Sequence, residues 1–471
     1  MPPRRRPNSP PDPSSPRPAS PSPDRDQSPE DETDDLSDSS SLPFYNTTFS
    51  AHRVSPLYLG NEPLTPNRLQ ILAQRLRDRL VGDVVRGVEV GLGPDGGDSA
   101  LGRAGVLERV EIRWVSVAAV LDVSLEELGS WEADGDDDTA EWPRGAGELQ
   151  SKKALHISLG YELASCTALL LPSLTGGERD GASARKARFS VGVRGDDMDA
   201  EEQAVDPTHF LILPLLLLRM PAPLKNVIGD FLSTTFDCRI SPMRLGTRSL
   251  VSSWEAWIKS AGLPSRGPLA KDVVLSLGFY VPPPDKPSAA LSQPSGEDEA
   301  TTATDQHLGL KSIDVIIPAA ELRRLVAAGK RIAKPQNKRT ASTEWGWEDD
   351  LRKRRSLAGR LYEEGWEWRA ASSDRDGKGD GNGGLENQPF TEALACYLKE
   401  HLGLNLFHPG VRVIKIACGG FVMSETRLKL FAPAGSAEVE GRTASVVGQR
   451  AAVWELLGGL VGKAHVQMVV G

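Results

Sequence analysis

Paired cysteines are missing from this chain of 471 residues, and it contains only 7 histidines. Its cysteines are isolated thiols with no CxxC spacing and no histidine at the distance of a shared ligand; they are Cys166, Cys238, Cys396 and Cys418. A disulfide framework or a structural zinc site needs such residues in pairs. We therefore expect reduced thiols in a nuclear or cytosolic protein, with no metal site and no cofactor.

Long apolar runs and a positive net charge are also absent. No apolar stretch approaches the roughly 18 residues of a membrane span, and the first residues, MPPRRRPNSPP, contain no hydrophobic signal core. The formal net charge is -9, which excludes a general basic field of the kind that drives nonspecific nucleic-acid binding. We expect no contact with membranes, and any surface for DNA should be local.

Composition divides the chain into four regions. Residues 1–41 hold five Ser-Pro dipeptides and an acidic Ser/Asp run with almost nothing apolar, which predicts a disordered tail. We expect an N-terminal α+β region at 42–282 and a C-terminal α+β region at 307–471, joined by a flexible linker at 283–306 that is rich in Pro, Ser and acidic residues. The sequence leaves open whether the two α+β regions are separate domains or share one sheet.

The N-terminal region alternates a helix with strands. Thr65 is a good N-cap, Pro66 suits the first helical position, and leucines follow at helical spacing, so a helix begins here. Short β-type runs separated by Gly- and Asp-rich inserts then predict a mostly antiparallel meander. The predicted strands are 84–90, 107–119, 155–171 and 187–193.

The stretch FLSTTFDCRISPMRL, residues 231–245, follows an apolar stripe that begins at Leu224 and predicts a second helix ending near Phe236. We interpret Asp237–Arg239 as the joint between that helix and a Ser241-Pro242 turn. Cys238 beside Asp237 also raises the alternative of a nucleophile. No histidine stands in a recognisable catalytic motif, so we predict no catalytic residue.

The remaining elements repeat the alternation of helix and strand. Residues 411–419 and 421–432 are expected to form a hairpin closed by Gly419 and Gly420. The other predicted helices are 249–260, 319–330, 348–363, 391–402 and 446–462, and the other predicted strands are 272–282, 308–318 and 465–471.

A local basic segment follows the linker. Seven basic residues occur there with no acidic residue between them: Arg323, Arg324, Lys330, Arg331, Lys334, Lys338 and Arg339. A second run lies at 352–355, with Arg360 after it. These side chains are candidates for contacts with DNA phosphates, and the alternative is an ordinary solvated loop.

Two late strands, VRVIKIAC and ETRLKLF, alternate apolar and basic residues, which predicts one core face and one polar face. An uncovered edge at these strands would invite pairing with another chain. The candidate partner-binding residues are Val411, Val413, Lys415, Ile416, Arg427, Lys429 and Phe431. The alternative is an edge that this chain covers itself.

Three stretches together resemble a known family: PFYNTTFSAHRVSPLY with the helix that follows it, the FLSTTFDCRISPMRL joint, and PFTEALACYLKEHLGLNL leading to IKIACGGFVMSETRLKLF. They are similar to fungal members of the CENP-L family, subunits of the constitutive inner kinetochore. The likeness spans about residues 43–431 in scattered blocks. The tail and the Gly/Asp-rich inserts lie outside it.

The resemblance implies a non-enzymatic nuclear scaffold with an α+β fold, in which helices pack on a large, curved, mainly antiparallel sheet. Such a protein would form a heterodimer with a CENP-N-like protein, join other inner-kinetochore subunits at the CENP-A nucleosome, and lie against centromeric DNA through a basic groove. In isolation, a homodimer is a further expectation. Two alternatives remain: a free-standing DNA-binding chromatin protein that uses residues 323–360, and a cysteine-dependent enzyme centred on Cys238.

Overall fold

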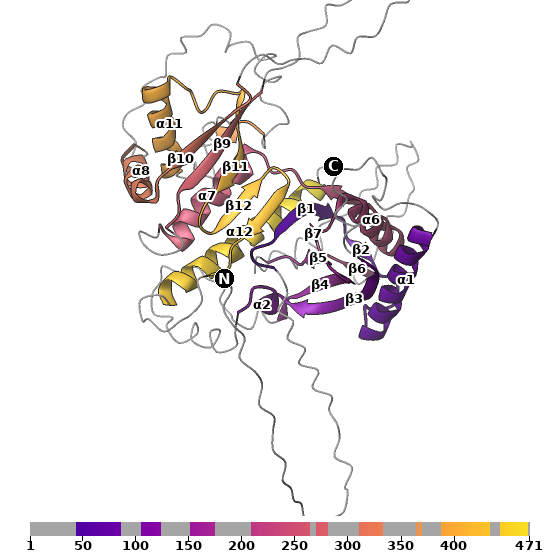
Figure 1. Cartoon of the computed structure of the whole chain (residues 1–471). Coiled ribbons are helices and arrows are strands. Elements are labelled where there is room, and N and C mark those ends of the chain that lie inside the picture. Colours follow the sequence, from indigo (N-terminus) through magenta and orange to yellow (C-terminus); the bar gives the residue numbers. More distant parts are fainter. Residues whose placement is uncertain are drawn as a thin grey trace, which may run out of the picture. The chain divides into compact units, whose positions relative to one another are not determined.

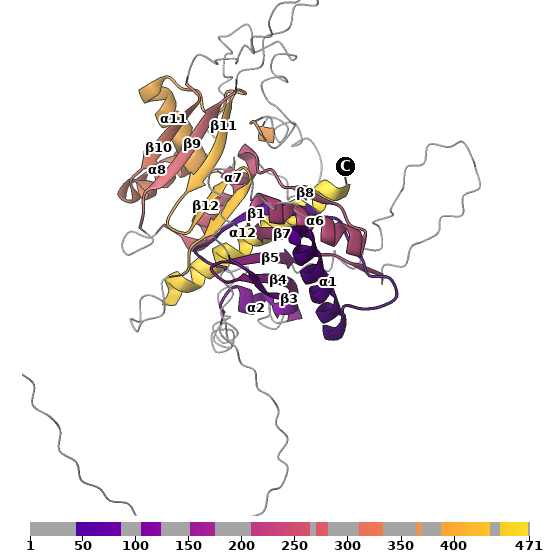
Figure 2. The same cartoon turned by 45° about the vertical axis from the view of Figure 1, so that its right-hand side comes forward.

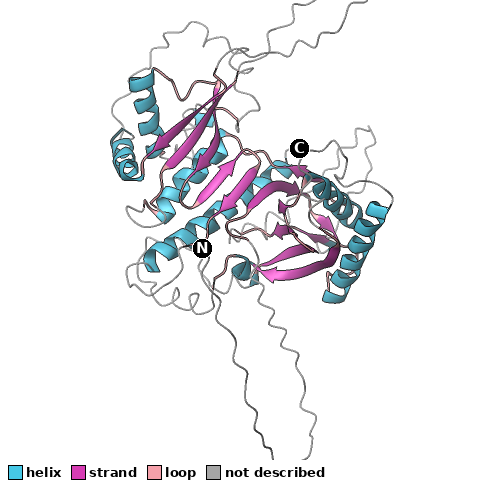
Figure 3. Ribbon diagram, in the orientation of Figure 1, coloured by secondary structure: helices cyan, strands magenta, loops and turns pink. Residues whose placement is uncertain are grey.

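The computed structural model describes residues 44–85, 105–123, 151–174, 209–263, 270–280, 310–332, 364–366, 368–369, 388–433 and 443–469. Helices pack on one large antiparallel sheet (Figure 1), and Figure 3 distinguishes the helices from the strands by colour. The predicted α+β class is confirmed.

The strands are β1 (Thr48–Val54), β2 (Leu57–Tyr58), β3 (Leu107–Ser116), β4 (Lys153–Tyr161), β5 (Ser165–Leu171), β6 (Phe210–Leu211), β7 (Leu215–Arg219), β8 (Ile240–Pro242), β9 (Val273–Phe279), β10 (Ser312–Ile317), β11 (Val411–Ala417), β12 (Phe421–Ser424) and β13 (Arg427–Leu430). The helices are α1 (Pro66–Val85), α2 (Val117–Val120), α6 (Ala222–Phe236), α7 (Thr247–Ala261), α8 (Ala319–Ile332), α11 (Pro389–Leu402) and α12 (Thr443–Val469).

The described residues form an 11-stranded sheet with the order β10-β9-β11-β12-β13-β1-β7-β5-β4-β3, and β8 pairs with β1 beside this path. The first strand, β1, lies in the middle, with β13 on one side and β7 on the other. Strands from both sides of residues 283–306 therefore belong to one sheet, which answers the question that the sequence left open.

Two apolar cores lie on opposite faces of this sheet. One core joins α1 and α6 to residues of β4, β5 and β7 such as Leu155, Leu170 and Leu216. The other core joins α7, α8, α11 and α12 to the alternate residues of the same strands and to the buried residues of β9–β13. Because successive side chains of a strand point to opposite faces, β7, β5 and β4 contribute buried residues to both cores.

Residues 231–245 form the joint between helix and strand that the sequence predicts. α6 ends at Phe236, and Asp237 takes a left-handed conformation with φ 45°. The backbone N–H of Arg239 donates to Ser55 Oγ at 2.8 Å. The expected turn at Ser241-Pro242 is wrong, because these residues extend as β8 beside β1. Pro242 is tolerated there since β8 is short and has no second neighbour in the described sheet.

Other expected boundaries shift for local reasons. Thr65 caps α1 by accepting the Arg68 N–H at 3.3 Å, as predicted, but α1 continues to Val85, so the predicted strand at 84–90 is wrong at its start. Residues 155–171 split into the hairpin β4–β5, and 421–432 split into β12 and β13. The predicted terminal strand at 465–471 is wrong, because α12 runs to Val469. The strand at 187–193 and the helix at 348–363 lie outside the described residues.

Candidate functional site

The two edge strands of the sheet differ in chemistry. β3 carries Glu108, Arg109, Glu111 and Arg113, and Arg109 pairs with Glu111. β10, with the sequence SIDVII, has a single charged residue, Asp314, whose carboxylate accepts a hydrogen bond from Ser276 Oγ at 2.5 Å. Charged side chains discourage pairing with another chain at an edge strand. Among the described strands, β10 is therefore the edge better suited to accept a further strand.

Beside β10 lies a face of the sheet that belongs to neither core. We define the open face as the outward residues of β10, β9, β11, β12 and β13, opposite the helices α7, α8 and α11. A row of directly paired residues crosses it: Ile316, Val274, Ala417, Val422 and Lys429. None of these residues is a member of the two apolar cores, and Ile316 is 63% exposed. The apolar end of this row adjoins the β10 edge.

Basic residues lie on the open face from its middle strand onward. Lys415 of β11 and Arg427 of β13 are exposed, and Lys429 of β13 is half-buried. Lys225 of α6 lies near Arg427 and near His52 of β1. Burial, and then the positive charge of Arg427, lower the pKa of Lys225. Burial and then Lys225 lower the pKa of His52 to about 4. The mutual repulsion of these groups indicates a positive potential that favours an anion.

The predicted partner-binding residues lie inside the sheet. β11 pairs with β9 along its length and with β12 at Lys415–Ala417, and β13 pairs with β12 and β1. Where β12 does not reach β11, the Val413 N–H donates to Thr247 Oγ1 at 3.0 Å and Trp366 Nε1 donates to the Val411 carbonyl at 3.0 Å. Of the two alternatives that the sequence left open for these strands, the structure agrees with an edge that the chain covers itself.

Individually, the predicted partner residues fall into two groups. Val411, Val413 and Ile416 are buried in the core. Lys415, Arg427 and Lys429 lie on the open face, and the Lys429 ammonium stands over the ring of Phe431, 5.3 Å from its centroid. The basic members of the predicted set thus remain accessible, and a role in partner binding stays a prediction.

The predicted DNA-contact residues are only partly described. Arg323 donates to the Leu263 carbonyl at 3.0 and 2.8 Å, and Arg324 pairs with Glu321 at 3.0 Å. Lys330 and Arg331 are exposed in the last turn of α8. Lys334, Lys338, Arg339, the run at 352–355 and Arg360 lie outside the described residues. A contact of this segment with DNA stays a prediction.

Cys238 lacks the surroundings of a nucleophile. Its side chain is buried, its Sγ lies 3.5 Å from the Leu232 carbonyl, and burial raises its pKa to about 11. Such a thiol stays protonated at neutral pH. No group of three or more metal-ligating side chains gathers within the described ranges, and no described helix is long and apolar enough to cross a membrane.

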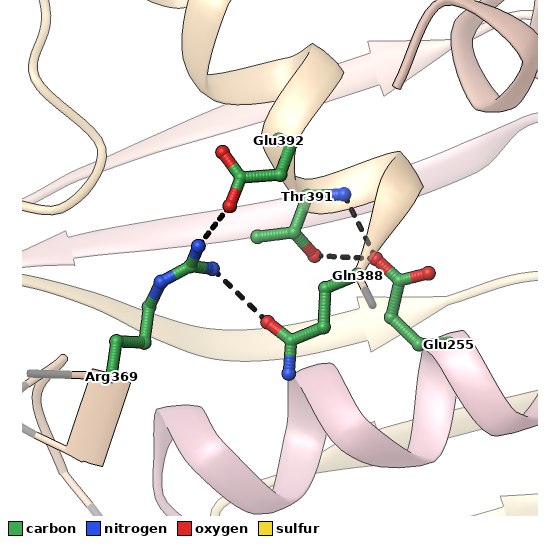
Figure 4. Close-up of polar contacts among 5 residues, drawn as sticks. All are labelled: Glu255, Arg369, Gln388, Thr391 and Glu392. Atoms are coloured by element: carbon green, nitrogen blue, oxygen red, sulfur yellow. Dashed lines mark hydrogen bonds and ion pairs between the residues drawn. The ribbon is translucent and has the colours of Figure 1, made fainter. Parts of the chain in front are cut away.

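A polar anchor behind the open face holds α11 against α7 (Figure 4). Glu255 of α7 accepts hydrogen bonds from the Thr391 N–H at 2.9 Å and from Thr391 Oγ1 at 2.8 Å. Arg369 donates to Gln388 Oε1 at 3.1 Å and pairs with Glu392. The anchor satisfies the start of α11, which has no side-chain cap of its own at Gln388. It therefore fixes the helices that support β9–β11.

Sequence reasoning missed the residues that define the edge and the face. The alternation in SIDVII indicated a strand, but only the sheet order makes β10 an edge. Val274, Ala417 and Val422 are ordinary strand residues until register places them in one row. The contribution of Lys225 depends on where the first turn of α6 lies beside the sheet. No motif within one segment carries these signals.

Comparison with models of known protein families shows which family this chain belongs to. The family model described as Centromere protein L (CENP-L) matches residues 43–465. No curated protein matches the chain. The match spans nearly all of the residues that the structure describes and agrees with the resemblance in the sequence. The chain belongs to the Centromere protein L family, and it is accordingly a nuclear kinetochore protein that associates with other inner-kinetochore subunits.

Proposed function

We propose that this chain is a non-enzymatic scaffold subunit that forms a heterodimer with a CENP-N-like protein and helps to anchor the inner kinetochore to CENP-A centromeric chromatin. The observation that carries the proposal is the β10 edge beside the apolar end of the open face. An edge strand presents backbone N–H and C=O groups for a further strand. In this proposal the partner supplies that strand.

The residues beside β10 support strand addition. Ile316 is 63% exposed and Leu310 is 66% exposed, so a partner strand would remove apolar surface from water as well as satisfying backbone groups. Burial of such side chains contributes roughly 25 cal/mol per Å². The opposite edge, β3, has alternating acidic and basic residues instead. This contrast favours β10 over β3.

Co-expression with a CENP-N-like chain tests the heterodimer. We expect co-elution at micromolar concentration, and separate elution of the wild-type chains would refute the pairing. Ile316→Lys should weaken the complex at least tenfold, because a charge would enter the new apolar contact, a cost of about 1.4 kcal/mol or more. Leu163→Lys is the matched control, since Leu163 is exposed in the β4–β5 turn. Equal affinity of the two variants would exclude docking at β10. If the isolated chain dimerises through the same edge, Ile316→Lys should also abolish that homodimer.

The basic residues of the open face support a second contact, with the phosphates of centromeric DNA. Lys225, Lys415, Arg427 and Lys429 would neutralise phosphates and release counterions, which makes affinity depend on salt. This surface extends from β11 to β13 and α6, whereas the proposed partner edge is β10. One chain can therefore serve both contacts.

Two sets of charge reversals separate this contact from the alternative of a free-standing DNA-binding protein. Reversal of Lys415, Arg427 and Lys429 to Glu should lower DNA affinity of the assembled complex and reduce the salt slope by about one per lost phosphate contact, while the heterodimer forms normally. Reversal of Lys330, Arg331, Lys338 and Arg339 is the comparison set. If only the second set abolishes DNA binding by the isolated chain, the alternative is correct.

A further inference from the structure

The free edge of β10 presents its backbone groups in a fixed register. The Phe279 N–H donates to the Lys311 carbonyl at 3.1 Å, so Lys311 turns its backbone groups toward β9. In an antiparallel ladder the bonded side alternates from one residue to the next, and every second residue after Lys311 therefore also faces β9. The residues between them turn both N–H and C=O toward the free edge: Ser312, Asp314 and Ile316.

The side chains of these same three residues belong to the open face. Side chains alternate along a strand, and Ile317 of β10 lies in the core on the helical side. Ser312, Asp314 and Ile316 have the opposite parity, and all three are exposed. An antiparallel strand added to β10 would therefore place a side chain of its own directly opposite each of them, with Cα atoms about 5.5 Å apart.

Asp314 is the single charged residue of β10. The Ser276 hydroxyl donates to its Oδ1 at 2.5 Å, and no ion pair among the described residues includes it. Lys415 shares its cross-strand row but lies on the far side of β9, about 9–10 Å away at the usual strand spacing. The carboxylate can therefore still be neutralised by a cation from the side of the free edge.

Apolar side chains flank Asp314 on the open face. Ile316 is 63% exposed on one side of it along β10. On the other side, Ser312 pairs with Gly278, and Ile414 covers that glycine, because a Cβ there would lie 2.9 Å from Ile414 Cγ2. An added strand would remove Asp314 from water together with these neighbours, and a charge that loses water without gaining a counter-charge is costly. A basic residue opposite Asp314 removes this cost, since opposite charges across two strands attract.

A second copy of this chain is the other candidate for the edge, and Asp314 acts against it. Two copies related by a twofold axis would pair β10 with itself in antiparallel orientation. The register that engages all three free-edge residues sets Ser312 opposite Ile316, and Asp314 opposite Asp314 of the second copy. Like charges directly opposite each other destabilise a strand pair. The same carboxylate thus favours a basic strand and disfavours self-pairing.

We propose that Asp314 selects the strand that joins β10: the partner strand carries a lysine or arginine directly opposite Asp314, and a second copy of this chain is disfavoured. The inference rests on the proposed function, because it concerns the partner strand at the same edge. The proposed function requires only that a strand adds to β10, whereas Asp314 fixes the charge and the register of that strand. Specificity then comes from repulsion of the wrong strand as well as from attraction of the right one.

A mixture of two forms of the full-length chain tests the edge without any partner protein. Fluorescently labelled wild-type chain is titrated with unlabelled Asp314→Lys chain, and Kd is measured by sedimentation. In the mixed pair a lysine stands opposite Asp314. We expect this pair to associate about tenfold more tightly than wild type with itself or Asp314→Lys with itself. Equal Kd values for the mixed pair and the like pairs overturn the proposal.

Two further variants separate the charge from the fold. Asp314→Asn keeps an oxygen that accepts from the Ser276 hydroxyl and removes only the charge. It should self-associate several-fold more tightly than wild type, and self-association no tighter than that of wild type contradicts the repulsion. Asp78→Lys is the matched control, because Asp78 is exposed on α1 and accepts from Gln74 Nε2 at 2.8 Å. This control should bind wild type no more tightly than wild type binds itself.

The complex provides the second test, with the CENP-N-like chain as the probe. Asp314→Asn should raise Kd of the heterodimer about three- to fivefold, and Asp314→Lys about tenfold or more. A general loss of structure would weaken both assemblies, whereas Asp314→Asn should weaken the heterodimer and strengthen self-association. An unchanged heterodimer Kd for Asp314→Lys overturns the proposal. If the wild-type chains do not bind each other, the proposed function fails, and the mixed-pair measurement still decides whether β10 accepts a strand with a cation opposite Asp314.

Discussion

The two halves of the sheet solve the burial of their strands differently. The covered half, β1, β7, β5, β4 and β3, lies between two cores, whereas the open half, β10, β9, β11, β12 and β13, has a core on one face. Figures 1 and 2 both show α1 and α6 beside the covered half and α8 and α11 beside β9 and β10. The strands of both halves are joined by backbone hydrogen bonds into one sheet.

The strand sequences record this difference. β5 (SCTALLL) and β7 (LLLLR) are nearly continuous apolar runs, as expected for strands buried on both faces. β10 (SIDVII) and β11 (VRVIKIA) mix apolar residues with charged ones. In the open half, one face of each strand therefore contributes to no apolar core.

The largest expected effect compares matched truncations in the two halves. Leu216→Ala should lower the free energy of unfolding by about 2–5 kcal/mol, because Leu216 is fully buried in the covered half. Ile316→Ala in the open half should cost about 1 kcal/mol or less, since the side chain is already in water. Urea denaturation of both variants measures the difference. Similar losses would show that the open face is covered within the isolated chain.

A medium effect is expected from acidification of the covered half. Burial, and then Arg113, lower the pKa of His156 from 6.5 to about 4. A histidine whose folded-state pKa lies below its unfolded value stabilises the fold above the unfolded pKa, and this contribution is lost as pH falls from about 6.5 toward 4. The loss should reach roughly 3 kcal/mol. His156→Leu should flatten this part of the stability curve, and an unchanged slope would contradict the burial of a neutral imidazole.

The smallest effect has the opposite sign and belongs to the open half. Burial raises the pKa of Glu255, although hydrogen bonds from Thr391 oppose the shift. The folded state then holds the proton more tightly than the unfolded chain, so stability should fall as pH rises above about 4.5. Glu255→Gln keeps an acceptor for Thr391 and removes the charge. We expect equal or higher stability at pH 7 and a weaker slope, whereas a large loss at pH 7 would show that the charge itself holds α11.

Local sequence patterns predicted which segments form helices and strands better than they predicted which strands pair with each other. The stripe from Leu224 to Phe236 was sufficient for α6, because helical spacing is a property of one segment. The pairing of β11 could not be predicted in this way. Its backbone N–H at Val413 and carbonyl at Val411 pair with the side chains of Thr247 and Trp366, which lie far away in sequence. Likewise, the alternation of VRVIKIA is the same for an edge strand and an interior strand. Sequence patterns fix the face of a strand, whereas its neighbours depend on long-range register.

The position of β1 has a consequence for synthesis on the ribosome. The strand at Thr48–Val54 leaves the ribosome early, yet one of its pairing edges is filled only when Arg427–Leu430 has been made. Until then, a growing chain carries a strand with an unsatisfied edge, a state that favours aggregation. A chain that ends before residue 427 would keep that edge open, so we expect it to aggregate more readily than the full-length chain.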